Sequence, residues 1–309
     1  MKIFLKKAAF FFAAIFIVAA AGGYLADGYS DDSYLRFTSP KQTSLILGTS
    51  RSEQGIVPSV IDSLIPGCKI YNFSFSIIQS PYGPAYYNAI KKKLDEKRAG
   101  KGLFILAVDP WAISSETKDP DDSAHFRENS LALSNMNSVN SYPNYEYLSK
   151  NYAQPFFHLL LDKVKKRKEY SVIKKDGWLQ VNVSMDSNKV SRRTDQRIKK
   201  YVTDYAPYYK LSSLRVHYLD KIINYLKTRG DVYLVRLPIH PRMMEIENRL
   251  LPSFDSVINN LSSKNNVSYI NYEDSGYRYK YVDGNHLYKD DAKIVTAQIA
   301  GFIKSRGYK

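Results

Sequence analysis

Two short polar segments of the sequence carry residues that could supply a nucleophile and its base. Ser50 follows an apolar run at 43–47, within Gly-Thr-Ser-Arg-Ser, and Asp283 and His286 lie three residues apart within Asp-Gly-Asn-His. A serine hydroxyl is a weak nucleophile on its own, and an imidazole can take its proton near neutral pH. Asp283 can accept the second ring N–H of His286 and so fix the tautomer. These residue types predict acyl transfer through Ser50.

The segments between these motifs alternate between strand and helix patterns. Short apolar runs predict five strands, at 43–47, 69–75, 103–108, 231–237 and 267–271. Helical patterns are found at 57–64, 81–98, 207–229, 243–261 and 290–304. Such alternation indicates an α/β fold, and we expect a three-layer α/β/α sandwich with a mainly parallel five-stranded sheet. Ligands of these folds bind beyond the carboxyl ends of the strands, where both motifs lie.

The first 27 residues differ in composition from the rest. Lys2, Lys6 and Lys7 precede an uncharged run at 8–26, which as a helix would span about 28 Å, close to the ~30 Å hydrocarbon core. The run predicts an N-terminal transmembrane anchor; a cleaved signal peptide is the alternative. A buried core helix is disfavoured because no polar face interrupts the run. The lysines favour a cytoplasmic N-terminus, so we expect a single-pass protein with its soluble domain on the extracytoplasmic side of the cytoplasmic membrane.

The rest of the chain is expected to form one domain at 40–309. Residues 111–205 lack the strand and helix rhythm and are rich in Ser, Asn, Tyr and Lys, which predicts an inserted cap near the active edge. The single cysteine, Cys68, excludes an intramolecular disulfide and a cysteine-based zinc site. The His and carboxylate spacings do not suggest a metal site, and phosphate-binding glycine motifs are lacking, so we expect neither metal nor cofactor.

The chain is strongly basic, with 45 Lys and Arg against 30 Asp and Glu and a net charge of +15. Residues 163–200 hold 13 of these basic residues against 4 acidic ones. Such a stretch would attract anionic lipids if it lies near the membrane, or an anionic glycopolymer if it borders the cleft. A solvated basic surface is the third interpretation. Nucleic acid would suit the charge, but the expected compartment excludes it.

The motifs resemble those of the SGNH/GDSL hydrolases. Gly-Thr-Ser-Arg-Ser is similar to the first block of that family, with Ser50 as the nucleophile. Asp-Gly-Asn-His is similar to the last block, which gives Asp283 and His286 the other triad positions, and 72–76 resembles the second block. The likeness covers 40–110 and 206–305 and is nearest to the membrane-anchored branch of alginate O-acetyltransferase-like and teichoic-acid D-alanylation proteins. It implies a serine-dependent O-acyl esterase or acyltransferase acting on an acylated envelope or secreted glycopolymer, with envelope proteins as further partners.

The chain departs from that family where the oxyanion donors are expected. The second block lacks the family's Gly, although a main-chain N–H of Ser76 or Ile77 can serve. The third block has Asp109 in place of Asn, and an ionised carboxylate only accepts hydrogen bonds. Losing one oxyanion donor costs about 10²–10³ in rate. A catalytically inactive module that binds a polysaccharide or a membrane partner is therefore the alternative function, with Asp109 holding a loop or a substrate hydroxyl.

Other side chains are weaker candidates for the site. Arg236, near the end of a predicted strand, could bind a carboxylate or phosphate of the polymer or form a structural ion pair. His240 lies at the same edge of the sheet. Trp111 and Trp178 could stack on sugar rings or pack in the core. A flavodoxin-like anion site, with 48–52 as its phosphate loop, leaves Asp-Gly-Asn-His unexplained.

Overall fold

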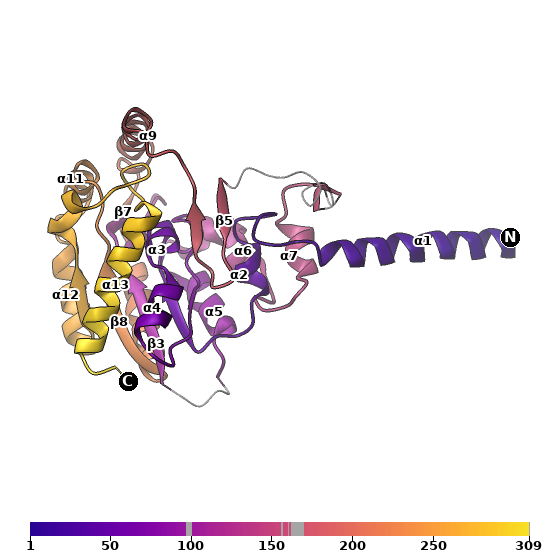
Figure 1. The fold of residues 1–309 in the computed structure, drawn as a ribbon, viewed down its shortest axis with the longest axis horizontal. Helices are drawn as coiled ribbons and strands as arrows, with labels where there is room; N and C mark the ends of the chain where they lie inside the picture. Colours follow the sequence, from indigo (N-terminus) through magenta and orange to yellow (C-terminus); the bar gives the residue numbers. More distant parts are fainter. Residues whose placement is uncertain (97–100, 156, 160, 162–169, 309) are drawn as a thin grey trace.

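A parallel sheet forms the centre of the protein, for which we describe a computed structural model (Figure 1). The structure describes all residues except 97–100, 156, 160, 162–169 and 309. The sheet has the spatial order β2-β1-β3-β8-β9, and all of its pairings are parallel. Its strands are β1 Ser44–Leu47, β2 Ile70–Asn72, β3 Gly102–Ala107, β8 Gly230–Arg236 and β9 Ser268–Asn271. The α/β class and the five parallel strands predicted from the sequence are confirmed.

Alternate side chains of each strand enter two separate cores. Leu45 and Leu47 pack in one cluster, whereas Ile46 between them packs in the other. The first cluster is completed by α5 Pro84–Lys93, α10 Ser213–Lys227 and α12 Phe254–Asn265. The second is completed by α4 Pro58–Leu64 and α13 Lys289–Ser305. Helices therefore cover both faces of the sheet, which explains why apolar residues of its strands occur on both faces.

The single helix predicted over 243–261 is wrong. The structure has two helices there, α11 Pro241–Leu250 and α12, and the chain between them contains Pro252. Proline has no N–H to donate and its ring clashes with the preceding turn, so a continuous helix cannot pass through this position. The break turns α12 onto the first core, where Phe254 and Ile258 are buried.

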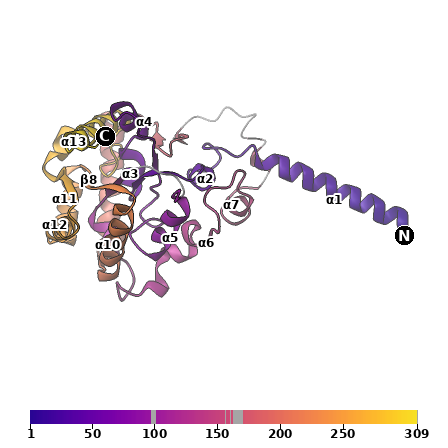
Figure 2. The same ribbon diagram turned by 90° about the horizontal axis from the view of Figure 1, so that it is seen from below.

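Helix α1, Lys2–Gly23, projects away from the body in both views (Figures 1 and 2). It is long and apolar enough to cross a membrane, and its most apolar stretch of 18 residues has a mean hydropathy of 2.1 and is not buried in the body. Of the described residues of the helix, only Gly22 and Gly23, at its end, are buried. The packed body begins before the predicted boundary at residue 40. Ala26 belongs to the first core, and Tyr34 and Phe37 on α2, Tyr34–Thr38, are fully buried in it. The segment after α1 is thus part of the folded domain.

The described part of 111–205 contains a hairpin, one long helix and several short elements. Strands β5 Ser171–Ile173 and β6 Leu179–Val181 pair antiparallel, and α9 Ser187–Lys200 continues into a π-helical turn, η4 Tyr201–Tyr205. Of the basic stretch, 192–200 lies on α9, whereas 163–168 lies outside the described residues. The other elements are α3 Ser50–Gly55, α6 Ala132–Asn135, α7 Tyr145–Lys150, η1 Pro110–Ile113, η2 Ser123–His125, η3 Arg127–Ser130, η5 Glu273–Arg278, and the antiparallel pair β4 Ser114–Ser115 and β7 Lys210–Leu211.

Candidate active site

The chain makes a tight turn between β1 and the serine at the start of α3. Gly48 has a φ of +141°, a conformation that side chains with a Cβ rarely adopt. A Cβ at this position would also lie 2.9 Å from the carbonyl oxygen of Ala107 on β3. Thr49 follows in an extended conformation, and Ser50 is the first residue of α3. The turn therefore places the Ser50 hydroxyl at the carboxyl edge of the sheet.

The structure brings Ser50, His286 and Asp283 into one hydrogen-bonded line. The Ser50 Oγ lies 2.9 Å from the His286 Nε2, across a sequence separation of 236 residues. The His286 Nδ1 lies 3.0 Å from the Asp283 Oδ1 and 3.1 Å from Oδ2. Asp283 and His286 are buried and Ser50 is half-buried. In this geometry the imidazole can accept the hydroxyl proton while the carboxylate holds the ring and stabilises its charged form.

The loop that carries Asp283 and His286 is held by its own hydrogen bonds. The Asp283 Oδ1 accepts the backbone N–H groups of Asn285 and His286 at 3.1 and 3.0 Å. Burial by itself raises the pKa of the Asp283 carboxyl, but His286, Arg197 and the Asn285 N–H together outweigh it and hold that pKa well below its usual range. The carboxylate is therefore ionised at neutral pH.

A helix of the inserted segment reaches this loop. Arg197 on α9 donates from Nε and Nη2 to the Asp283 Oδ2 at 2.9 and 2.7 Å. Four residues earlier, the Arg193 Nε donates to the Val282 carbonyl at 2.8 Å. Sequence analysis placed a basic stretch here but did not single out Arg197. The charge run contains several equivalent arginines and lysines, and only the docking of α9 selects one of them.

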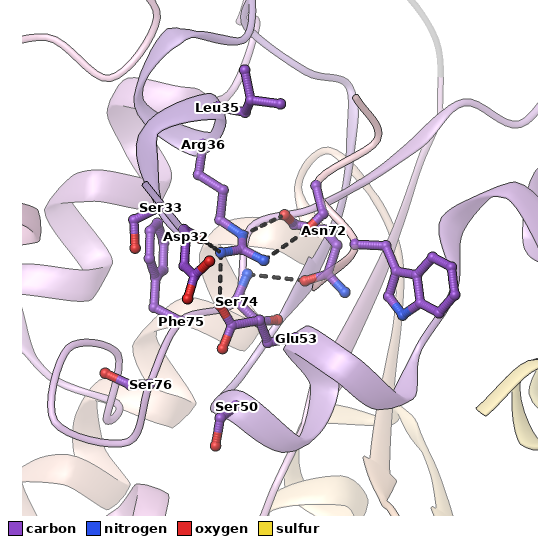
Figure 3. Close-up of polar contacts among 12 residues, drawn as sticks. Asp32, Ser33, Leu35, Arg36, Ser50, Glu53, Asn72, Ser74, Phe75 and Ser76 are labelled. Atoms are coloured by element: carbon purple, nitrogen blue, oxygen red, sulfur yellow. Dashed lines mark hydrogen bonds and ion pairs between the residues drawn. The ribbon is translucent and has the colours of Figure 1, made fainter. Parts of the chain in front are cut away.

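A buried ion pair lies behind the serine, at the centre of Figure 3. The Arg36 Nη1 on α2 contacts the Glu53 Oε1 on α3 at 2.7 Å, and the Arg36 Nη2 donates to the Gly177 carbonyl at 2.6 Å. The Arg36 Nε also donates to the Asn72 carbonyl at the end of β2, at 3.4 Å. Burial raises the pKa of Glu53, with Arg36 opposing that effect. Arg36 thus links α2 to three other segments, which are α3, the end of β2 and the loop that contains Gly177.

Arg236, which the sequence offered as a candidate for polymer binding, forms ion pairs with carboxylates of the protein itself. Its guanidinium is buried and contacts Glu247, Asp255 and Glu273 at 3.4, 2.5 and 3.3 Å. Glu247 also pairs with Arg51 at 2.6 Å. This is the structural ion pair that sequence analysis held as the alternative to polymer binding.

The Asp109 carboxylate holds the loop before the serine. It accepts hydrogen bonds from the Thr49 Oγ1 and the Ala112 N–H, both at 2.9 Å. Ser76 and Ile77 lie half-buried in the loop after β2, and the neighbouring Phe75 N–H donates to the Gly48 carbonyl at 3.4 Å. The loop that contains Asp109 and the loop that contains Ser76 and Ile77 are the two places where oxyanion donors were expected. Both are hydrogen-bonded to the turn that carries Ser50.

The two tryptophans pack inside the protein. Trp111 and Trp178 are 2% and 6% exposed, and their ring N–H groups donate to the Glu247 carboxylate and to the Gln54 carbonyl. These positions leave little ring surface for a sugar. Among the described residues, no group of three or more His, Cys, Asp or Glu could hold a metal ion.

A cavity of about 450 Å³ lies between α9 and the segment that leads to Asp283. His240, on the loop after β8, lines the cavity together with Arg242. Burial lowers the pKa of His240, and the positive charge of Arg242 adds a smaller effect in the same direction. The Arg242 Nη1 pairs with the Asp195 Oδ1 on α9 at 2.7 Å. The remaining lining residues are Met185, Ser187, Val190, Ser191, Thr194, Tyr279, Lys280 and Tyr281. The basic helix therefore borders a hollow beside the Asp283 loop.

No protein-family model, curated protein or solved structure matches this chain. The function therefore has to be inferred from the hydrogen-bonded line from Ser50 to Asp283 and from the elements that enclose it.

Proposed function

We propose that the protein is a membrane-anchored, serine-dependent O-acyl esterase or acyltransferase that acts on an envelope or secreted glycopolymer. The observation that supports this most is the 2.9 Å contact between the Ser50 Oγ and the His286 Nε2, with Asp283 on the far ring nitrogen. Two loops more than 200 residues apart supply these groups in the order that acyl transfer needs.

In the proposed reaction His286 transfers one proton in each of two half-reactions. Its Nε2 takes the proton of the Ser50 hydroxyl while Oγ attacks the acyl carbonyl, and the same proton then passes to the departing sugar oxygen. The resulting acyl-serine is attacked by a second hydroxyl group, whose proton His286 accepts and returns to Ser50. Water as the acceptor gives hydrolysis, and a sugar hydroxyl gives transfer.

The oxyanion would be bound by main-chain groups. We assign the donors to the Ser50 N–H at the first position of α3 and to the N–H of Ser76 or Ile77 in the loop after β2. Asp109 is not assigned as a donor, because its carboxylate already accepts hydrogen bonds from Thr49 and Ala112. This difference from the SGNH/GDSL pattern favours one second candidate, an inactive module that binds the polymer.

The proposal includes an SGNH/GDSL-type, three-layer α/β/α sandwich attached to the cytoplasmic membrane by α1. The helices on both faces of the parallel sheet are consistent with that architecture. The lysines at positions 2, 6 and 7 support a cytoplasmic N-terminus, with the body on the extracytoplasmic side. The net charge of +15 and the basic side chains of Arg242 and Lys280 in the cavity wall support an anionic polymer as the substrate.

A serine-directed fluorophosphonate and a chromogenic acetyl ester test the proposal. We expect labelling of Ser50 and ester turnover by the full chain in detergent, and loss of both in Ser50→Ala. Ser59→Ala, an exposed serine on the nearby helix α4, is the matched control and should leave both unchanged. Unchanged turnover in Ser50→Ala would refute the mechanism, and polymer binding without labelling would favour the inactive module.

A further inference from the structure

We propose that Arg197 on α9 is a positioning residue that holds the Asp283 carboxylate and sets the pH range in which the Ser50–His286 pair works. The inference rests on the proposed function and adds to it a role for the inserted segment. The predicted cap would then be part of the site's chemistry rather than only a cover.

The two oxygens of Asp283 accept hydrogen bonds from different donors, and both lie close to the His286 ring. Oδ1 accepts the two backbone N–H groups of its own loop, and the His286 Nδ1 lies 3.0 Å from Oδ1 and 3.1 Å from Oδ2. Oδ2 receives the Arg197 Nε and Nη2 at 2.9 and 2.7 Å. Because donors hold both oxygens, the carboxylate cannot rotate away from the imidazole without breaking at least one charged hydrogen bond.

Helix α9 contacts the residues on either side of Asp283 in the chain, so the Arg197 contact is not an isolated surface pair. Arg193 binds the Val282 carbonyl, one residue before Asp283. Thr194 is 5% exposed, and a Cβ on Gly284, one residue after Asp283, would lie 2.9 Å from its Cγ2. Positions 193, 194 and 197 share one face of the helix.

In this proposal the charge of Arg197 acts on the imidazole through the Asp283 carboxylate, which it contacts. A cation beside the Asp283–His286 pair partly offsets the carboxylate and disfavours the protonated ring, which cannot act as a base. Of the other charged groups near the loop, Glu53 pairs with Arg36, Arg51 pairs with Glu247 and donates to the Asn285 Oδ1, and Arg193 donates to the Val282 carbonyl. Asp109 is held by Thr49 and Ala112, and the remaining neighbours of Arg197 are the phenols of Tyr201 and Tyr205. Among the described residues, Arg197 is therefore the arginine that contacts the Asp283 carboxylate itself.

Variants at this position separate charge from geometry. The rate of fluorophosphonate labelling would be measured from pH 5 to pH 9 for the full chain in detergent. In Arg197→Gln we expect the acid limb of the profile to move up by about half to one pH unit, because a lost positive charge favours the protonated ring. Arg197→Lys should return the limb towards its wild-type position but recover the rate only in part, since an ammonium lacks the two-point contact.

Arg192→Gln is the matched control, because Arg192 is an exposed arginine on the same helix. It should leave both the rate and the profile unchanged. A merely structural role for Arg197 predicts a different pattern, in which Arg197→Gln lowers the rate by one factor at every pH. That pattern, or a profile identical to the wild type, would overturn the inference while the labelling itself still supports the proposed function.

A second readout needs no turnover. The chain has five histidines, and the His286 ring signal can be assigned by its loss in His286→Gln after selective ¹³C-histidine labelling. Its NMR titration should have a higher midpoint in Arg197→Gln than in the wild type, and an unchanged midpoint overturns the inference. This comparison holds whether or not the phosphonate reacts, so failure of the proposed function and failure of the role of Arg197 are distinguishable.

Discussion

Arg36 and Glu53 form a buried ion pair that ties the segment following α1 to the helix that begins at Ser50. Their Nη1 and Oε1 atoms are 2.7 Å apart, and both side chains are almost fully buried. Removing one partner of such a pair leaves an uncompensated charge inside the protein. The ion pair therefore links the start of the folded body to the helix that carries the candidate nucleophile.

Breaking this pair should destabilise the protein strongly. Arg36→Ala is expected to lower the free energy of unfolding by about 3–5 kcal/mol, measured by urea denaturation. The double variant Arg36→Met, Glu53→Gln should recover part of the loss, because it leaves no buried charge unpaired. Arg192→Ala, which changes an exposed arginine, should cost less than about 0.5 kcal/mol. Equal losses in the single and double variants would contradict this account.

The N-terminal boundary of the folded domain can be tested by truncation. A chain starting at residue 25 retains Ala26, Tyr34 and Phe37 in the core and should unfold cooperatively in solution. A chain starting at residue 40 loses these buried side chains and the Arg36 contacts, each lost aromatic ring being worth about 3–5 kcal/mol. We expect it to be unfolded or aggregated, as judged by near-UV circular dichroism. Equal stability of the two chains would place the boundary at 40.

Asp283→Asn should nearly abolish ester turnover without unfolding the protein. An amide facing the His286 Nδ1 favours the wrong ring tautomer, which in serine hydrolases costs about 10⁴ in kcat. The measurement is turnover of the chromogenic acetyl ester, with far-UV circular dichroism to check the fold. Asp290→Asn makes the same change at an exposed carboxylate on α13 and serves as the comparison. A loss of less than tenfold in Asp283→Asn would argue against the triad.

The ionised Asp283 should also appear in the pH dependence of stability. Its pKa is lower in the folded protein than the unfolded value of about 3.9, so its contribution is present above about pH 4 and is lost as pH falls towards the folded value. We expect the wild type to exceed Asp283→Asn by about 2 kcal/mol at pH 6, and the difference to shrink below about pH 4. Urea denaturation at each pH gives the comparison. A difference that stays constant down to pH 3 would contradict this linkage.

The cavity beside α9 should affect polymer substrates more than small esters. Lys280→Glu places a negative charge on an exposed wall of the cavity. For an acetylated anionic polysaccharide we expect KM to rise about tenfold from charge repulsion. Turnover of the small chromogenic ester should stay unchanged, because Ser50 and His286 keep their contact. Lys293→Glu, an exposed lysine on α13, is the control; equal effects of both variants would exclude a local role for the cavity.

The sequence alone determined the features that depend on local periodicity. The strands of the sheet were found from apolar runs because parallel strands covered on both faces are largely buried, as β1, β2 and β3 are along their whole length. The uncharged run at 8–26 predicted helix α1 because it is long and apolar enough to span a membrane as a helix. Ser50, Asp283 and His286 were found as candidates because their chemistry is distinctive and both motifs follow predicted strands.

Only the tertiary structure decided which distant groups meet. The contact of Ser50 with His286 needs two loops 236 residues apart to reach the same sheet edge, and no local pattern encodes that distance. In the same way, Arg236 is buried among carboxylates whereas Arg197 is aimed at Asp283, although both are arginines next to apolar residues in the sequence. Pairing of charges depends on how helices pack, and packing is a property of the whole chain.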